Sequence, residues 1–124
     1  MKLDMIGIIV ENTQRSLEFY RKLGWEIPEV AADENHVEIT LENGLRFAWD
    51  ELSMMQSFDP EAKISEQYVG AFLCSSPAEV DAKYLEITSA GHKGHKAPWD
   101  AFWGQRYAII KDPDGHKIDL FAPL

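Results

Sequence analysis

The alternation of apolar and polar residues runs through the same order of elements twice along the chain. The stretch "MIGIIVENTQRSLEFYRKLGWE" can be laid on "VGAFLCSSPAEVDAKYLEITSAGHK". Each begins with an apolar run of strand length, passes through a polar residue into a segment with helical spacing of apolar positions, and then reaches a glycine. Each stretch therefore predicts a strand followed by a helix.

Residues that favour helix ends support both predicted helices, and apolar positions three or four apart predict one buried face on each. The predicted end residues are Asn12 or Thr13 with Gly24 for the first helix, and Ser76, Pro77, Glu79 and Gly91 for the second. The predicted buried positions are Leu17, Tyr20 and Leu23 in the first helix, and Val80, Tyr84 and Ile87 in the second.

Three further strand-like segments follow each helix. They are roughly residues 25–30, 36–41 and 45–51 in the first half, and 92–96, 105–111 and 116–122 in the second. The sequences "ENG" and "DPDG" join the last two segments of each half. They predict hairpin turns, because Pro favours an early turn position and Gly tolerates the positive φ that closes a tight turn.

The doubled pattern predicts one domain over residues 1–124, with module one at about 1–51, a polar linker at about 52–66 and module two at about 67–124. Side chains alternate between the two faces of a strand, so one face of each sheet packs its helix and the other is concave. We therefore expect an α+β fold of two tandem β-α-β-β-β modules. Their curved mixed sheet surrounds a cup, and the helices lie on the convex face.

Composition limits the partners and the compartment. The chain has 21 Asp and Glu against 12 Lys and Arg, a formal net charge of −9, which argues against binding nucleic acid. No apolar run approaches the ~20 residues of a membrane span, and "MKLDMIGIIV" meets an acid too early for a signal peptide. The single cysteine, Cys74, fits a small buried strand residue in a reducing compartment. We expect a cytoplasmic protein.

The motifs "SLEFYRKLGWE", "AEVDAKY" and "PWDAFWGQRYAIIKDPDGHKIDLF" occur in this order within the doubled pattern. In this combination the chain resembles the vicinal oxygen chelate superfamily, which includes glyoxalase I, extradiol dioxygenases, and the fosfomycin and bleomycin resistance proteins. The resemblance covers essentially the whole chain. It also implies a homodimer, because cups in this superfamily are often completed by modules of two chains.

In the metal-using members, the ligands come from the first and last strand of each module. The resemblance places these positions at Met5, Ala48, Val69 and Asp119. Only Asp119 is a hard ligand of the kind that a divalent ion requires. We therefore expect no metal and no cofactor.

The histidines offer no replacement ligands. His92 and His95 lie in a glycine-containing segment predicted as strand or loop, where residues three apart point to opposite faces. His36 and His116 are isolated, and His116 has the parity of Ile118, on the helix side.

Parity from the four ligand-equivalent positions predicts which side chains point into the cup. The predicted inward set is Met5, Gly7, Ile9, Arg46, Ala48, Asp50, Val69, Ala71, Leu73, Lys117, Asp119 and Phe121. Among the tryptophans, Trp25 and Trp49 are predicted in the core, whereas Trp99 and Trp103 are predicted with Phe102 over the cup mouth. The candidate ligand-binding residues are Met5, Ile9, Arg46, Ala48, Val69, Ala71, Trp99, Phe102, Trp103, Arg106 and Asp119.

Three functions fit this pattern. The first is a metal-free protein, similar to the bleomycin resistance proteins, that binds or sequesters a small aromatic or cationic molecule. The second is a metal-dependent lyase or dioxygenase of the same superfamily. The third is a metal-free enzyme with Asp119 as general base. In a purely structural role, Asp119 would be hydrogen-bonded to a donor such as Arg46 or Arg106, because an acid among apolar neighbours needs a partner.

Overall fold

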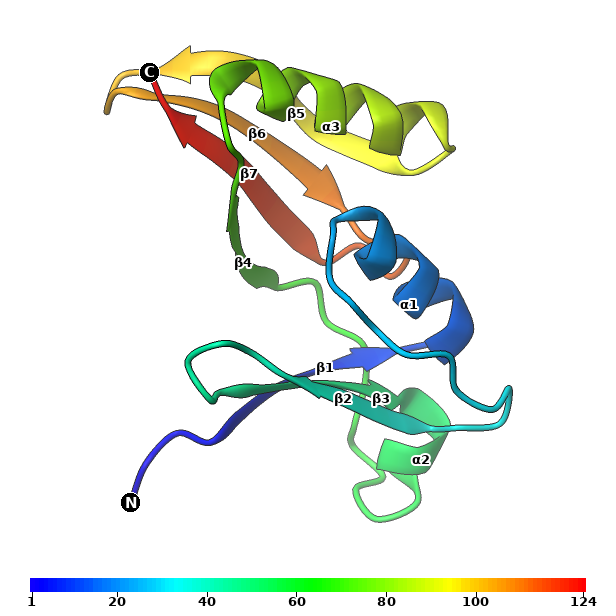
Figure 1. Ribbon diagram of the computed structural model, residues 1–124. Helices are drawn as coiled ribbons and strands as arrows, with labels where there is room; N and C mark the ends of the chain where they lie inside the picture. Colours follow the sequence, from blue (N-terminus) through cyan, green and yellow to red (C-terminus); the bar gives the residue numbers. More distant parts are fainter. The chain divides into compact units, whose positions relative to one another are not determined.

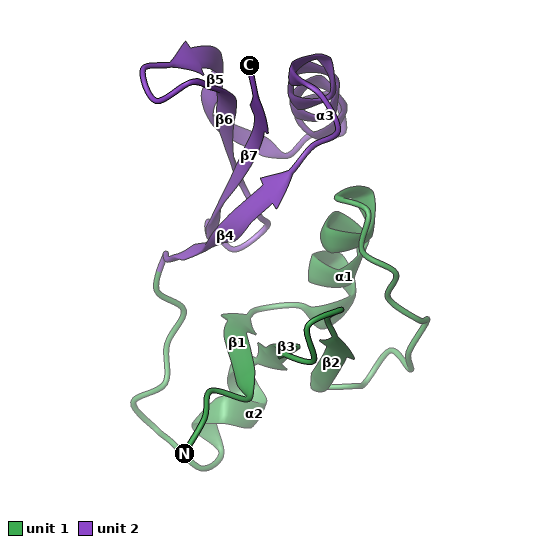
Figure 2. Cartoon of the chain, turned by 60° about the vertical axis from the view of Figure 1, so that its left-hand side comes forward, with its two compact units in different colours: residues 1–65 green, residues 66–124 purple.

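The computed structural model describes residues 1–124 and divides into two compact units, residues 1–65 and 66–124 (Figure 2). Each unit contains one sheet of mixed strand direction and a longer helix, in the element order that Figure 1 labels. The alternating helices and strands give the α+β class that the sequence predicts. No helix combines the length and the apolar character that crossing a bilayer requires.

The first unit contains three strands and two helices. In chain order these are β1 (Met5–Val10), α1 (Thr13–Lys22), β2 (His36–Thr40), β3 (Arg46–Glu51) and α2 (Leu52–Gln56). The sheet order is β1-β3-β2, with β1 parallel and β2 antiparallel to the central β3. Helix α1 starts at the Asn12 cap, whose side chain accepts a hydrogen bond from the Arg15 amide at 3.0 Å.

Aromatic rings join α1 to the sheet of the first unit. The Tyr20 ring on α1 lies 5.4 Å from the Trp49 ring and 6.2 Å from the Phe47 ring on β3. Trp25 stacks on Tyr20 at 5.8 Å. Trp49, Tyr20 and Leu17 are completely buried, which confirms the core positions predicted from parity and helical spacing.

Two predictions for the first unit need correction. Residues 25–30 do not form a strand, and two carbonyls in their middle are bound by a helix side chain instead of a neighbouring strand. Arg21 donates to the carbonyls of Ile27 and Pro28, both at 2.8 Å. Proline also has no amide to give to a ladder. The beginning of the predicted linker forms helix α2, so residues 52–66 are not all irregular.

The second unit contains four strands and one long helix. They are β4 (Tyr68–Leu73), α3 (Pro77–Ser89), β5 (Lys93–Ala101), β6 (Gln105–Lys111) and β7 (Lys117–Pro123), with the sheet order β4-β7-β6-β5. Strand β4 is parallel to β7, and the other neighbours are antiparallel. The Ser76 hydroxyl accepts from the Glu79 amide at 3.1 Å and so caps α3 as predicted.

Helix α3 covers one face of this sheet, and Figure 1 shows it running along β5 and β6. A Cβ at Gly94 on β5 would collide with the Tyr84 hydroxyl of α3. The strand residues on the helix face are buried: Ala108, Ile110, Ile118, Leu120 and Ala122. His116, immediately before β7, is buried as well. Cys74 follows β4 and is also buried, as predicted, and this burial raises the pKa of its thiol.

The "DPDG" turn joins β6 to β7 through a buried carboxylate. Asp112 is 4% exposed, and its Oδ1 accepts from the amides of Asp114 and His116, both at 2.9 Å. Gly115 closes the turn with φ of 88°. The side chain thus replaces backbone partners for two amides in the tight turn, which confirms the predicted hairpin.

We expect Asp112→Ala to lower the free energy of unfolding by about 1–3 kcal/mol, because two amides lose a buried acceptor. Asp112→Asn keeps an oxygen at the same position and should lose much less. Urea unfolding followed by circular dichroism measures both variants. Equal losses for the two substitutions would show that the acceptor oxygen is not what stabilises the turn.

Candidate functional site

The four positions that correspond to metal ligands all lie on strands, as predicted. In the first unit, Met5 lies opposite Arg46 in the β1–β3 register, and Ala48 lies opposite Gly7, all on the face away from Trp49. In the second unit, Asp119 lies opposite Ala71. Val69 lies on β4 at a break in the register.

The β4–β7 register shifts between Tyr68 and Gly70, which places Tyr68 opposite Lys117 and leaves Val69 without a partner in the register. The place of Val69 on the Asp119 face therefore stays a prediction. A β-bulge inserts one residue and breaks the alternation on which the prediction relied.

These residues do not fit a divalent ion. Met5, Ala48 and Val69 offer no oxygen or nitrogen side-chain donor, and Asp119 is the only hard ligand of the set. No group of three or more His, Cys, Asp or Glu side chains is placed to hold a metal ion. The chemistry of the site must therefore be sought in the other groups around Asp119.

The face of the β4-β7-β6-β5 sheet opposite α3, here called the open face, presents its residues in rows across the strands. One row contains Lys96, Ile109, Asp119 and Ala71, and the next contains Trp99, Tyr107, Phe121 and Leu73. Asp119 thus has aromatic neighbours on the adjacent row. Candidate residues Ala71 and Asp119 lie on one face, as parity predicts. Trp99 is predicted in a loop between strands, but it lies on the same face within β5, which extends to Ala101.

Aromatic rings form a continuous cluster at this end of the open face. Tyr107 is at the centre, with its ring 5.5 Å from Trp99, 5.1 Å from Trp103 and 6.1 Å from Phe121. Phe102 packs edge-on against Trp103 at 4.9 Å and is 97% exposed. Trp99 belongs to β5, whereas Phe102 and Trp103 form the turn to β6. The cluster offers flat apolar surface to solvent.

Asp119 is held by a tyrosine. The Tyr107 hydroxyl donates to Asp119 Oδ2 at 2.5 Å, whereas Asp119 Oδ1 is buried and has no hydrogen-bond partner. Burial, and then the hydrogen bond to Asp119, raise the pKa of Tyr107 to about 12. The predicted partners, Arg46 and Arg106, are wrong. Sequence reasoning missed Tyr107, although its parity matches that of Asp119 in an antiparallel hairpin.

Arg106 lies on the helix face and not on the open face. Its Nε and Nη2 donate to the Asp81 carboxylate of α3 at 2.9 and 3.2 Å, and its Nη1 donates to Asp100 at 3.1 Å. The reason is strand alternation, because Arg106 adjoins Tyr107 and must point the other way. Its predicted location beside Asp119 is therefore wrong.

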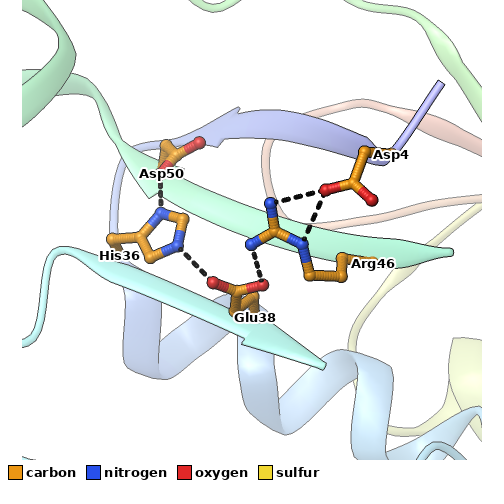
Figure 3. A network of polar contacts seen from close by, with 5 residues as sticks. All are labelled: Asp4, His36, Glu38, Arg46 and Asp50. Carbon is orange, nitrogen blue, oxygen red and sulfur yellow. Dashed lines mark hydrogen bonds and ion pairs between the residues drawn. The ribbon is translucent and has the colours of Figure 1, made fainter. Parts of the chain in front are cut away.

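A second polar group occupies the first unit (Figure 3). Arg46 donates to Asp4 at 3.0 Å and to Glu38 at 2.6 Å, and His36 contacts Glu38 at 3.3 Å through Nε2 and Asp50 at 2.5 Å through Nδ1. The β2–β3 register explains the row, since His36 lies opposite Asp50 and Glu38 opposite Ala48. The prediction that His36 is isolated is wrong.

Charges alternate along this row, and hydrogen bonds within it shift the pKa values of His36 and Glu38. The hydrogen bond from His36 to the Asp50 carboxylate is the main cause that raises the pKa of His36, and the Arg46 guanidinium lowers the pKa of Glu38. Arg46 is a candidate ligand-binding residue, but in this row it is already paired with two carboxylates. The row is therefore internally satisfied, unlike the carboxylate of Asp119.

The family model described as Glyoxalase/Bleomycin resistance protein/Dioxygenase superfamily matches residues 2–120. Among curated proteins, an uncharacterized protein of Mycobacterium bovis is 39% identical over 46 residues, which is 37% of this chain and 30% of that protein. An uncharacterized protein of Mycobacterium tuberculosis matches at the same identity over 27% of its length. This chain thus aligns with about a third of the length of these relatives, or less.

Solved structures resemble the chain over nearly its full length. A glyoxalase-related enzyme from Fulvimarina pelagi has a TM-score of 0.80 at 18% identity, and the match covers 98% of this chain and 88% of that one. A glyoxalase/bleomycin resistance protein/dioxygenase from Nocardioides has a TM-score of 0.72 at 22% identity, with coverage of 100% and 84%. At these identities the likeness concerns the fold, and it agrees with the predicted doubled module.

We expect the His36 ring to titrate above 6.5, its ordinary pKa, because its protonated form is held by two carboxylates. NMR titration of the ring protons measures this, and Asp50→Asn should bring the midpoint down. The stabilisation from protonated His36 is fully present below pH 6.5 and disappears as pH rises through the raised pKa. Unfolding of His36→Gln at several pH values tests this, with exposed His95→Gln as control. A midpoint unmoved by Asp50→Asn would contradict the assignment.

Proposed function

The chain belongs to the Glyoxalase/Bleomycin resistance protein/Dioxygenase superfamily, and from that premise we propose that it binds a small planar aromatic molecule on the open face of its second unit. The molecule carries a hydrogen-bond donor or a positive charge. It stacks against the cluster around Tyr107 and places its donor at Asp119. This function is binding or sequestration.

The observation that carries the proposal is the state of the Asp119 carboxylate. One oxygen is held by Tyr107, and the other is buried with no partner. A buried acceptor left without a donor costs roughly 1–3 kcal/mol, so folded proteins rarely keep one without a reason. A ligand that donates to Oδ1 would remove this cost, and a charged donor would form the stronger bond.

The rings beside Asp119 favour a flat and positively charged ligand. Trp103 is 47% exposed and Phe102 97% exposed, so their surface is open to a second aromatic system. Trp99 already accepts a cation, because the Lys96 ammonium lies 4.2 Å from its ring centroid. Aromatic faces and a carboxylate are the usual groups by which proteins recognise organic cations.

The same carboxylate supports a second candidate function, in which Asp119 acts as a general base. Tyr107 donates to Asp119 Oδ2, and Oδ1 has no partner. Oδ1 is therefore the oxygen that would accept a proton from a bound substrate. No residue set in either unit supports the metal-dependent lyase or dioxygenase alternative, since Asp119 is alone among the four ligand-equivalent positions as a hard donor.

Quenching of tryptophan fluorescence by proflavine, a planar aminoacridine cation, and by a bleomycin-type glycopeptide tests binding directly. We expect Trp103→Ala to weaken affinity about tenfold to a hundredfold, as for a binding hot spot. Asp119→Asn keeps the shape and an acceptor for Tyr107 but removes the charge, and should cost about tenfold. Phe58→Ala, which removes an exposed aromatic residue of the first unit, serves as the matched control.

Tight binding that neither Trp103→Ala nor Asp119→Asn weakens would refute this site. Absence of binding, together with turnover of a substrate that requires Asp119, would favour the general-base function instead.

We further expect the purified protein to contain no stoichiometric Zn, Ni, Fe or Mn, because one hard ligand does not retain a divalent ion. Elemental analysis after expression in metal-supplemented medium provides the measurement. About one metal ion per chain, lost in Asp119→Ala, would overturn the metal-free assignment.

A further inference from the structure

A third row on the open face consists of lysines. Lys93 on β5 lies opposite Lys111 on β6, which in turn lies opposite Lys117 on β7. Lys111 has the parity of Tyr107, and Lys117 has the parity of Asp119, so the row is on the open face. Because Gly94 points toward Tyr84 of α3, its neighbour Lys93 points away from the helix.

This row is electrostatically unfavourable on its own. Like charges directly opposite one another on neighbouring strands destabilise a sheet. One carboxylate lies nearby, with Glu66 Oε1 3.9 Å from the Lys111 ammonium. The Lys117 ammonium lies 5.3 Å from the Tyr68 ring centroid, and no carboxylate is within ion-pair distance of Lys93 or Lys117. Glu66 is thus the one carboxylate within ion-pair distance of the three ammonium groups, in a chain whose formal net charge is −9.

A hollow of about 320 Å³ adjoins the β5–β6 end of this row. Lys93 and Lys111 line it, together with His92, Glu66 and the backbone of the β6–β7 turn. Asp112 and Asp114 also line it, but the Asp112 carboxylate accepts from two turn amides. The hollow is large enough for a carboxylate or phosphate group.

The three rows have a fixed order and spacing. Successive residues on one face of a strand are about 7 Å apart, so the lysine row is about 7 Å from Asp119 and about 14 Å from the Tyr107–Phe121 row. Along β7 the order is Lys117, Asp119, Phe121. The open face therefore changes from basic to acidic to aromatic over the length of one small molecule.

We infer that the ligand of this face also carries an anionic group, a carboxylate or a phosphate, which binds at Lys93, Lys111 and Lys117 while its ring lies on the aromatic cluster. This inference rests on the proposed function and specifies the class of ligand, which is an aromatic molecule with a donor in its middle and an anion at its far end. A purely cationic tail would be repelled by the lysine row.

Two fluorescent probes isolate the anionic contact. Dansylcadaverine and ε-dansyl-lysine share a naphthalene ring, a sulfonamide N–H and an aliphatic chain with a terminal amine, and they differ only in the carboxylate of the second. We expect ε-dansyl-lysine to bind about fivefold more tightly, as for a partly exposed ion pair. Added salt should reduce this preference.

Substitutions in the lysine row test whether it causes the preference for ε-dansyl-lysine over dansylcadaverine. The double change Lys93→Gln and Lys111→Gln should abolish it, and the double change to Arg should retain it. Lys83→Gln on α3, which removes a lysine paired with Glu86, is the matched control and should leave it unchanged. Inorganic phosphate and acetate, added separately as competitors, distinguish a phosphate site from a carboxylate site by which of them weakens ε-dansyl-lysine binding.

Equal affinity for the two probes, or a preference that survives the double Gln change, would overturn the anionic subsite. If both probes bind equally and Trp103→Ala weakens both, the aromatic site stands and only this inference fails. If neither probe binds and proflavine does not quench tryptophan fluorescence, the proposed function itself fails.

Discussion

The register of the β6–β7 hairpin is the constraint on which the open face of the second unit depends. The buried Asp112 carboxylate fixes the turn, and the turn sets Ile109 opposite Asp119 and Tyr107 opposite Phe121. Because strand side chains alternate with a period of two, a slip of one residue would exchange the two faces. The hydrophobic core under α3 and the row order on the open face are therefore specified by the same turn.

The two units differ in how fully the charged side chains on their sheets are paired. In the first unit, the row from Asp4 to Asp50 pairs each charge with an opposite one, so it stabilises the hairpin and leaves no group free. In the second unit, Asp119 keeps an unbonded oxygen, and Lys93 lacks an ion-pair partner. The buried oxygen of Asp119, which has no donor, is the observation from which we infer a ligand there.

Strand parity and turn chemistry allowed much of this arrangement to be predicted from sequence. They placed Trp49 in the core and Asp119 on the face away from the helix, because alternation requires only a correct turn position. They failed where a local contact overrides the pattern. Arg21 binds the carbonyls of Ile27 and Pro28 in the segment predicted as a strand, and the register shifts at Val69. The partner of Asp119 was missed because a tyrosine hydroxyl has no sequence signal until the register is known.

The hydrogen bond from Tyr107 has a consequence for the geometry of recognition. The pKa of this phenol is about 12, so the hydroxyl remains a donor and occupies one carboxylate oxygen throughout the neutral range. A guanidinium group binds best as a fork that engages both oxygens of a carboxylate. With one oxygen already occupied, the carboxylate accepts a monodentate donor such as an amine more readily than a bidentate one. In the proposed site, Tyr107 would therefore select the shape of the ligand's donor as well as support the acid.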